Sequence, residues 1–495
     1  MKALTCVGWH SLLLLYCIVN PNTLFMPFRP AILLLFGLGL CCALWGRSAE
    51  GGVLIDEISI SGNKRTKAAV IRREMLIQEG DTIPLGELSA RISRCEEVIM
   101  NTGLFNRAKI TYKEWEGSTN RVHLLVTVEE GWYIFPVPIF ELADRNFNVW
   151  WVDQGRALDR TNYGLHFAHI NVSGHRDKLK STIKYGYTRK YSLFYERPYL
   201  NRSKTLGAWV DAGYWANREV NYATREGKQV FFRKEDGFLY RHFSGSLGLA
   251  YRPDIFGTHR LELEYRDTRV GAEVTEELNP DYLLEGRSRL RSFRLAYQYV
   301  YENRDAAAYP WSGNFAFAAA VKDGLGVFGQ RSGLTVYGGY GHYFPMGQRW
   351  SFGAEARAKY SVIRSPQPYR ENRALGFGNY TLHGWEYYIV DGLDLGLLKT
   401  ALRFRFWSFD FNFGKLMPMQ ALRSMPVRLQ LALNNDLAFV NSPHNRADNP
   451  FSNRLLWGGG LGLEAVFYYD KVVRIEYSLN DLLEKGLFLH FSMNI

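Results

Sequence analysis

Residues 324–329 carry a glycine spacing that could do chemistry on a nucleotide. Gly324, Gly326 and Gly329 match the pattern G-x-G-x-x-G, in which glycines let the backbone approach a pyrophosphate at the start of a helix. Here the motif lies between two segments with strand periodicity, and no helical pattern follows it. We therefore interpret it as a hairpin connection.

The residue types of other catalytic sites do not gather at useful spacings. Walker, HExxH and GxSxG motifs are lacking, and the 11 histidines are scattered without metal-ligand spacing. Of the five cysteines, four (Cys6, Cys17, Cys41 and Cys42) lie before residue 45, which leaves only Cys95 beyond them. In a chain trimmed after this region, neither an internal disulfide nor a cysteine-based metal site can form. We predict a protein that is not an enzyme and binds no cofactor or metal.

The first 49 residues read as a signal or leader segment. Apolar stretches at residues 12–19 and 31–45 are both shorter than the roughly 20 apolar residues of a spanning helix. The second stretch follows Arg29, which gives the basic region and apolar core of a secretory signal. Met26 is a candidate for the true start. The prediction is export, and an anchored helix is the alternative.

Residues 53–131 predict a small α+β domain with the order β-α-α-β-β. A strand at 53–61 ends in the turn Gly62-Asn63, and Thr66 can cap the helix that follows. Two alternating strands at the end of the domain predict a hairpin around Gly117. The second helix places five apolar residues on one stripe, which makes Cys95 a core residue: Leu85, Leu88, Ile92, Cys95 and Ile99.

From residue 133 to residue 495, short alternating segments replace helical periodicity. Leu261, Leu263 and Tyr265 alternate with charged residues, as expected for strands with one apolar and one wet face. Aromatic residues make up 15% of the chain, and the mean hydropathy is −0.22, which excludes a bundle of transmembrane helices. The last strand has the same alternation, with these apolar residues on one face: Leu487, Leu489, Phe491, Met493 and Ile495.

Sixteen segments of this region carry strand periodicity, an even number as expected for a bacterial transmembrane barrel. A phase change between Phe406 and Phe409 predicts a bulge or an interface crossing. The segments are residues 134–140, 164–172, 178–187, 190–197, 205–215, 243–251, 259–268, 291–301, 314–321, 332–343, 349–360, 399–406, 427–439, 459–468, 472–478 and 487–495.

Residues 376–392 form a connection too long and too patterned for an ordinary turn, and loops of this length are usually functional. Its centre reads His383-Gly384-Trp385. The alternative is a surface loop with some aromatic packing. The formal charge of +11 could suggest nucleic acid, but the basic residues alternate with apolar ones along strands instead of forming a run.

Two short segments resemble the POTRA domain of the Omp85 superfamily, as does the order of the predicted elements. The segments are residues 58–63, Ile-Ser-Ile-Ser-Gly-Asn, and residues 102–105, Thr-Gly-Leu-Phe. The resemblance implies one α+β POTRA domain at 53–131 and a mostly β, 16-stranded antiparallel transmembrane barrel at 133–495. Residues 139–146 and 468–471 are similar to a BamA/TamA-like group from Bacteroidota with a single POTRA domain.

The same resemblance assigns roles to the long connection and to the last strand. His383-Gly384-Trp385 resembles the Arg-Gly-aromatic tripeptide of the sixth extracellular loop, with His in place of Arg, and Asp436 stands where its acidic partner is expected. This pair would be a hydrogen bond with a neutral imidazole and an ion pair with a protonated one. The strand at 487–495 would be one side of a lateral gate.

The function implied is assembly or insertion of other barrel proteins in the bacterial outer membrane, with the POTRA domain in the periplasm. Partners would be outer-membrane lipids, unfolded outer-membrane client proteins and possible accessory lipoproteins, without nucleic acid. An edge of the POTRA sheet and the seam between the first and last strands would template client strands. The alternatives are a pore or channel for polypeptide translocation and a surface adhesin or structural barrel.

Overall fold

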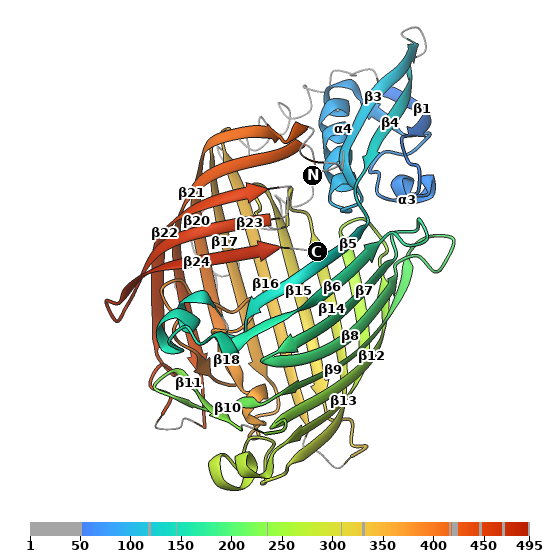
Figure 1. Cartoon of the computed structure of the whole chain (residues 1–495). Coiled ribbons are helices and arrows are strands. Elements are labelled where there is room, and N and C mark those ends of the chain that lie inside the picture. Colours follow the sequence, from blue (N-terminus) through green and yellow to red (C-terminus); the bar gives the residue numbers. More distant parts are fainter. Residues whose placement is uncertain are drawn as a thin grey trace, which may run out of the picture.

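The computed structural model describes residues 52–116, 120–144, 146–234, 236–307, 309–328, 332–414, 417, 424–444, 448–467 and 471–493. The side chains of residues 491–493 are left out of this description. The predicted leader at 1–49, the hairpin tip around Gly117 and the terminal Ile495 all lie outside the described residues. Figure 1 shows a small N-terminal domain above one end of a large curved sheet.

The N-terminal domain is a four-stranded sheet with two helices packed against it. The sheet order is β2-β1-β4-β3, and one apolar core joins the sheet to both helices. The elements are β1 (Gly52–Ser61), α3 (Ala68–Arg73), β2 (Thr82–Pro84), α4 (Leu85–Met100), β3 (Phe105–Glu116) and β4 (Arg121–Glu130). The predicted β-α-α-β-β order is therefore present, with the short strand β2 added between the helices.

Two details of this domain differ from the sequence-based prediction. The residue before α3 is Lys67 and no side chain caps this helix; the Thr66 hydroxyl instead lies 2.9 Å from the Tyr133 hydroxyl and accepts a hydrogen bond from Asn171. Leu85 starts α4 and is 52% exposed, so the buried stripe of this helix begins at Leu88. Cys95 is fully buried, as predicted.

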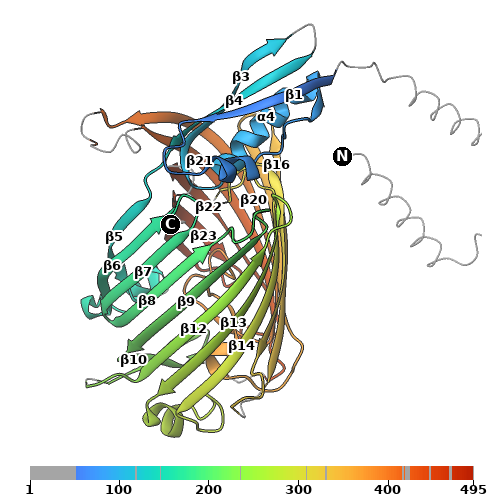
Figure 2. The same cartoon turned by 90° about the vertical axis from the view of Figure 1, so that its right-hand side faces the viewer.

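The remainder of the described chain forms a sixteen-stranded antiparallel sheet that curls into a barrel (Figures 1 and 2). Each of the sixteen predicted segments falls on a different strand. The predicted bulge is present as a register shift between Arg405 and Trp407. The strands are β5 (Ile134–Leu142), β6 (Thr161–Ile170), β7 (Lys178–Gly186), β8 (Thr188–Arg197), β9 (Leu206–Asn217), β12 (Tyr240–Tyr251), β13 (Gly257–Val270), β14 (Arg289–Glu302), β15 (Gly313–Asp323), β16 (Gly333–Met346), β17 (Trp350–Ser361), β20 (Asp394–Asn412), β21 (Ser424–Asn441), β22 (Leu455–Phe467), β23 (Lys471–Asn480) and β24 (Lys485–Met493).

The two faces of the barrel wall differ in the way that the alternation predicted. Leu261 and Leu263 are 45% and 43% exposed on the outer face, whereas Asp436, Glu464 and Glu476 are almost fully buried. An apolar exterior with charges on the inside is the pattern of a transmembrane barrel. The glycine motif at 324–329 begins the connection from β15 to β16, and its described part, residues 324–328, contains no helix.

Short elements outside the wall complete the fold. In the part of the chain that the structure describes, they are the hairpin β10 (Glu219–Arg225) and β11 (Lys228–Arg233), the pair β18 (Arg373–Leu375) and β19 (Val390–Asp391), and four helical turns at Val149–Asp153, Leu158–Arg160, Glu273–Leu278 and Tyr369–Glu371. The sequence did not predict these elements. Within the described residues, none of the helices combines the length and the apolar character that crossing a membrane requires.

Candidate functional site

The connection between β18 and β19, residues 376–389, lies against the inner wall formed by β21, β22 and β23. Its base is closed by the pairing of β18 with β19. An apolar cluster that includes Leu382, Trp385 and Leu456 packs it against the wall. The long connection is thus an ordered part of the barrel interior. We call residues 376–389 the inner loop.

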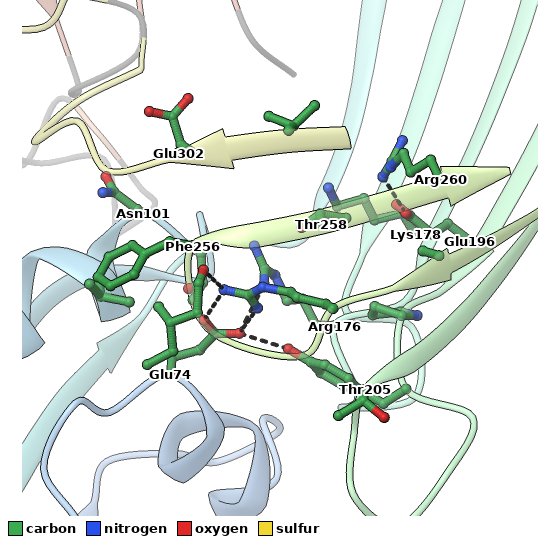
Figure 3. A pocket seen from close by; sticks show the side chains of 18 of the residues that line it. Glu74, Asn101, Arg176, Lys178, Glu196, Thr205, Phe256, Thr258, Arg260 and Glu302 are labelled. Carbon is green, nitrogen blue, oxygen red and sulfur yellow. Dashed lines mark hydrogen bonds and ion pairs between the residues drawn. The ribbon is translucent and has the colours of Figure 1, made fainter. Parts of the chain in front are cut away.

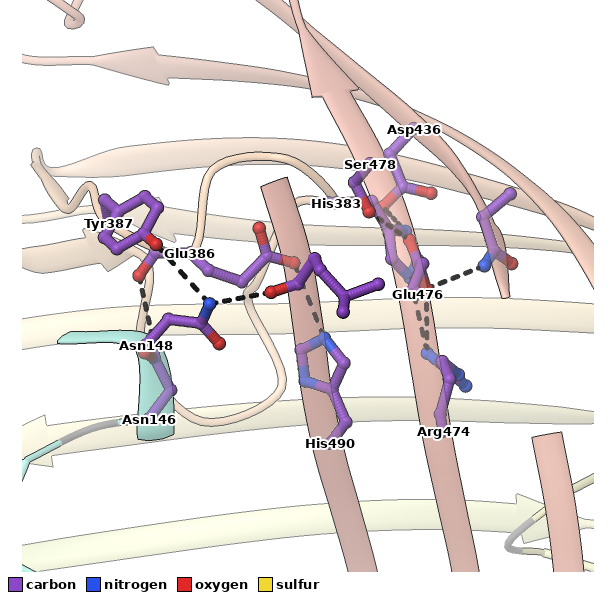
Figure 4. Close-up of polar contacts among 12 residues, drawn as sticks. Asn146, Asn148, His383, Glu386, Tyr387, Asp436, Arg474, Glu476, Ser478 and His490 are labelled. Atoms are coloured by element: carbon purple, nitrogen blue, oxygen red, sulfur yellow. Dashed lines mark hydrogen bonds and ion pairs between the residues drawn. The ribbon is translucent and has the colours of Figure 1, made fainter. Parts of the chain in front are cut away.

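His383 joins the inner loop to two buried carboxylates of the wall (Figure 4). Its Nδ1 lies 2.6 Å from Oδ2 of Asp436, and its backbone N–H donates to the same oxygen at 3.2 Å. Its Nε2 lies 3.4 Å from Oε2 of Glu476. Asp436 also lies 3.6 Å from the Lys399 ammonium. The structure therefore brings together His383 and the acidic residue that the sequence placed opposite it.

Gly384 allows the inner loop to pass close to the wall. Its φ is +79°, and a methyl group added there would lie 2.7 Å from the carbonyl oxygen of Leu479. Asn480 donates a hydrogen bond to the Gly384 carbonyl at 2.9 Å. The backbone of β22 in the wall lies just as close to the loop, because a methyl group on Gly458 would overlap the carbonyl oxygen of His383. Glycine is thus required on both sides of this contact.

Trp385 is the apolar anchor of the inner loop. Its side chain is 2% exposed, its indole N–H donates to the carbonyl of Trp457 at 2.8 Å, and its ring packs edge-on against Tyr388 and Phe451. A buried indole with its N–H satisfied fixes both position and orientation. The tripeptide thereby fixes the loop by hydrogen bonding at His383, by backbone fit at Gly384 and by burial at Trp385.

A wider polar network supports this contact, and sequence reasoning missed it. Glu476 accepts hydrogen bonds from Asn434 at 3.0 Å and from Ser478 at 2.6 Å. Arg474 Nη1 lies 3.3 Å from His383 Nε2, and its Nε donates to Glu464 at 2.8 Å. The available signal was the alternation in β23, which puts Arg474, Glu476 and Ser478 on the face opposite Ile475 and Tyr477.

The two ends of the sheet, β5 and β24, form a seam. They are the terminal strands of the sheet order, and within the described residues no ladder pairs them. In β24, Leu487 is 63% exposed and Phe488 is 2% exposed, which follows the predicted alternation, and Leu489 is partly exposed on the outer face. The side chains of Phe491 and Met493 lie outside the description.

The segment that follows β5 reaches β24 through side chains. Asn148 donates a hydrogen bond to the backbone carbonyl of Leu487 at 2.8 Å. Asn146 donates to the carbonyl of Glu386 in the inner loop at 2.8 Å, and Glu386 lies 3.6 Å from His490 of β24. Figure 4 shows these contacts converging beside the last strand. The seam and the inner loop are therefore parts of one connected site.

Residues 53–131 match the family model described as POTRA, a surface antigen variable number repeat. This segment is a POTRA domain. In the described residues, the chain therefore joins one POTRA domain to a sixteen-stranded antiparallel barrel.

Solved structures similar to this chain include one of BamA and two of CdiB. BamA from Haemophilus ducreyi lacking POTRA domains 1–3 is 16% identical, with a TM-score of 0.49 over 89% of this chain and 83% of that chain. CdiB from Escherichia coli is 13% identical, with a TM-score of 0.47 over 95% and 100%. CdiB from Acinetobacter baumannii is 13% identical, with a TM-score of 0.46 over 90% and 74%. Among curated proteins, none matches this chain.

The POTRA domain docks on the barrel through a buried carboxylate, shown in Figure 3. Glu74, at the end of α3, accepts hydrogen bonds from Arg252 at 2.5 and 2.7 Å and from the Tyr199 hydroxyl at 2.8 Å, and lies 3.2 Å from Arg176. Burial acts to raise the pKa of Glu74, but the two guanidinium groups and the hydroxyl outweigh it and lower the pKa to about 2. A cavity of about 430 Å³ lies at this junction.

The turn after β1 of the POTRA domain fits where the sequence placed it. Gly62 has a φ of +86°, and an added methyl group there would overlap the carbonyl oxygen of Val128. The Asn63 side chain donates to the carbonyl of Thr66 at 2.9 Å. Arg65 then donates to the carbonyl of Asn171, in the β6–β7 turn, at 2.9 Å. The segment after this turn thus brings Arg65 of the POTRA domain into contact with the barrel.

Proposed function

We propose that this protein inserts or assembles other barrel proteins in the bacterial outer membrane. The observation that carries the proposal is the seam: β5 and β24 end the sheet, and no backbone ladder joins them in the described residues. Backbone groups at a strand edge without a ladder are a template for an incoming strand. A client strand would add to this edge by backbone hydrogen bonding, which demands little of its sequence.

The POTRA domain would deliver clients from the periplasmic side. Its sheet has two edges, of which β2 is three residues long and β3 is twelve residues long. Only β3 is long enough to hold a client strand of ordinary length. We therefore assign strand addition in the POTRA domain to β3, a choice that the sequence left open.

The inner loop would hold the wall next to the seam in one shape while the seam exchanges partners. His383, Gly384 and Trp385 fix the loop to β21–β23, of which β23 pairs with β24. Insertion needs no nucleotide in this mechanism, because one set of backbone hydrogen bonds replaces another. The partners of the protein would be outer-membrane lipids, unfolded client barrels and possible accessory lipoproteins.

Reconstitution tests this proposal. The purified protein in liposomes is expected to accelerate folding of an urea-unfolded test barrel several-fold over empty liposomes. A variant with β5 and β24 joined by an engineered crosslink is expected to lose the acceleration, and reduction of the crosslink to restore it. Steady conductance in planar bilayers without any acceleration of folding would contradict the proposal and favour the pore alternative.

A further inference from the structure

The segment between β5 and β6 exposes a cluster of aromatic and apolar side chains next to the seam. Phe147, Trp151, Val152 and Leu158 are 39%, 44%, 60% and 75% exposed. The rings of Phe147 and Trp151 are stacked, with centroids 5.5 Å apart. Exposed aromatic and apolar side chains gathered in one short segment mark an interaction surface. We call residues 143–144 and 146–160 the seam loop.

The seam loop is held in a fixed conformation, so the cluster is a built feature. Arg160 is buried and pairs with Asp144 at 2.7 Å and with Glu219 of β10. The Trp150 indole N–H donates to the carbonyl of Ala157 at 2.9 Å. Asp153 pairs with Lys228 of β11 at 3.0 Å. These contacts fix the loop at both ends while its apolar side chains stay exposed.

Strand length places the seam loop at the level of the membrane surface. The seam strands β5 and β24 have nine residues each, whereas β13 has fourteen and β20 has nineteen. About 9–11 residues of tilted strand cross the hydrocarbon layer, so β5 and β24 have no length to spare. The seam loop starts directly after β5. Tyr163, near the start of β6, and Leu487, whose carbonyl Asn148 binds, are also exposed, at 59% and 63%.

The composition of the patch fits the boundary between lipid and water. Tryptophan and other amphipathic rings concentrate at that level, and arginine reaches from it toward headgroups. Here the Arg156 guanidinium lies 4.1 Å from the centre of a Trp151 ring. We propose that the seam loop inserts Phe147, Trp151, Val152 and Leu158 into the outer-leaflet interface and thereby positions the last strand.

The hydrogen bonds of the seam loop connect this lipid contact to the seam. Asn148 lies between Phe147 and the helical turn Val149–Asp153, and it donates to the carbonyl of Leu487 in β24. A loop held in the interface thus holds the start of β24 at a fixed depth. This positioning step rests on the proposed function, whereas the lipid contact stands without it.

Photo-crosslinking in bilayers tests the lipid contact. The photoreactive residue p-benzoylphenylalanine replaces Trp151 in the full chain, reconstituted in vesicles of phosphatidylethanolamine and phosphatidylglycerol, and lipid adducts are measured by mass spectrometry. Matched positions are Leu263 on the outer wall, 43% exposed, and Leu85 on the POTRA domain, 52% exposed. Position 151 is expected to give adducts at the level of position 263 and several-fold above position 85. Adducts at the level of position 85, or adducts to a second copy of the chain instead of lipid, overturn the proposal.

Hydrogen exchange tests the positioning step independently of client folding. Asn148→Ala is expected to speed exchange in residues 485–490 several-fold, while Asn201→Ala, which removes a side-chain network in the turn between β8 and β9, leaves them unchanged. Unchanged exchange in Asn148→Ala overturns the positioning role. If lipid adducts form at position 151 but the unaltered protein does not accelerate client folding, the result would count against the proposed function alone.

Discussion

The imidazole of His383 lies between the carboxylates of Asp436 and Glu476, 2.6 Å from the first and 3.4 Å from the second. Both carboxylates are fully buried. A charged carboxylate without a partner is costly in such a place, because burial removes the hydration of the ion. By partnering both carboxylates, His383 joins the inner loop to β21 and to β23, the strand that pairs with β24.

Replacing His383 tests this contact. His383→Ala leaves Asp436 without its imidazole partner, and we expect the inner loop to lose about 1–3 kcal/mol of docking free energy. His383→Arg keeps a side-chain donor beside Asp436 and should lose less. Limited proteolysis of residues 376–389 measures the difference. Equal losses in the two variants would show that a side-chain donor at position 383 is not what holds the loop.

Gly384→Ala tests the close approach of loop and wall. The new methyl group would meet the Leu479 carbonyl at 2.7 Å in a backbone with φ +79°, so we expect a loss of about 1–3 kcal/mol. Gly378→Ala is the matched control, since Gly378 also has a positive φ but has no atom within 4 Å of the added group. Thermal unfolding should separate the two variants, and identical midpoints would contradict the steric argument.

Trp385→Ala tests the apolar anchor. Removal of this buried indole leaves a cavity, and we expect a loss of about 3–5 kcal/mol in the stability of the loop region. Trp407→Ala is the control, because Trp407 is 58% exposed on the barrel and its loss creates no cavity. Hydrogen exchange across residues 376–392 provides the measurement. Similar exchange in both variants would mean that Trp385 does not anchor the loop.

The junction of the POTRA domain with the barrel should depend on acid. The pKa of Glu74 is lowered from 4.5 to about 2 by its two arginine partners, so the docked state favours the charged carboxylate. The stabilisation is complete above pH 4.5 and is lost as the pH falls toward 2. Glu74→Gln should weaken docking at neutral pH and flatten this dependence, while Glu87→Gln, an exposed pair member, should not. Crosslinking yield between the two domains as a function of pH checks this, and a flat profile in the unaltered protein would contradict it.

The sequence predicted the barrel well because the alternation of apolar and polar residues is itself the physical cause of the fold. Leu261, Leu263 and Tyr265 face outward because they alternate with charged residues, which is the pattern that predicted the strand. The phase change near Phe406 corresponds to a bulge in the structure. The POTRA helices were found through their apolar stripes, as Cys95 shows.

What the sequence could not give depends on long-range contacts. Thr66 looked like a helix cap, but its hydroxyl is used by Tyr133 and Asn171, and no local pattern shows a partner 105 residues away. The same holds for Glu74 with Arg252 and for Asn148 with Leu487. The tripeptide at His383 was found, whereas its second carboxylate, Glu476, became visible only when β23 was placed beside the inner loop.

The central claim is that client strands add to the edge of β24. Its most direct test is site-specific crosslinking during client folding, with p-benzoylphenylalanine at Leu489 in β24 and, as the control, at Leu463, an exposed position two strands away in β22. The account predicts adducts with the folding client from position 489 and not from position 463. Client folding at full rate with no adduct at position 489, or with equal adducts at both positions, would contradict it.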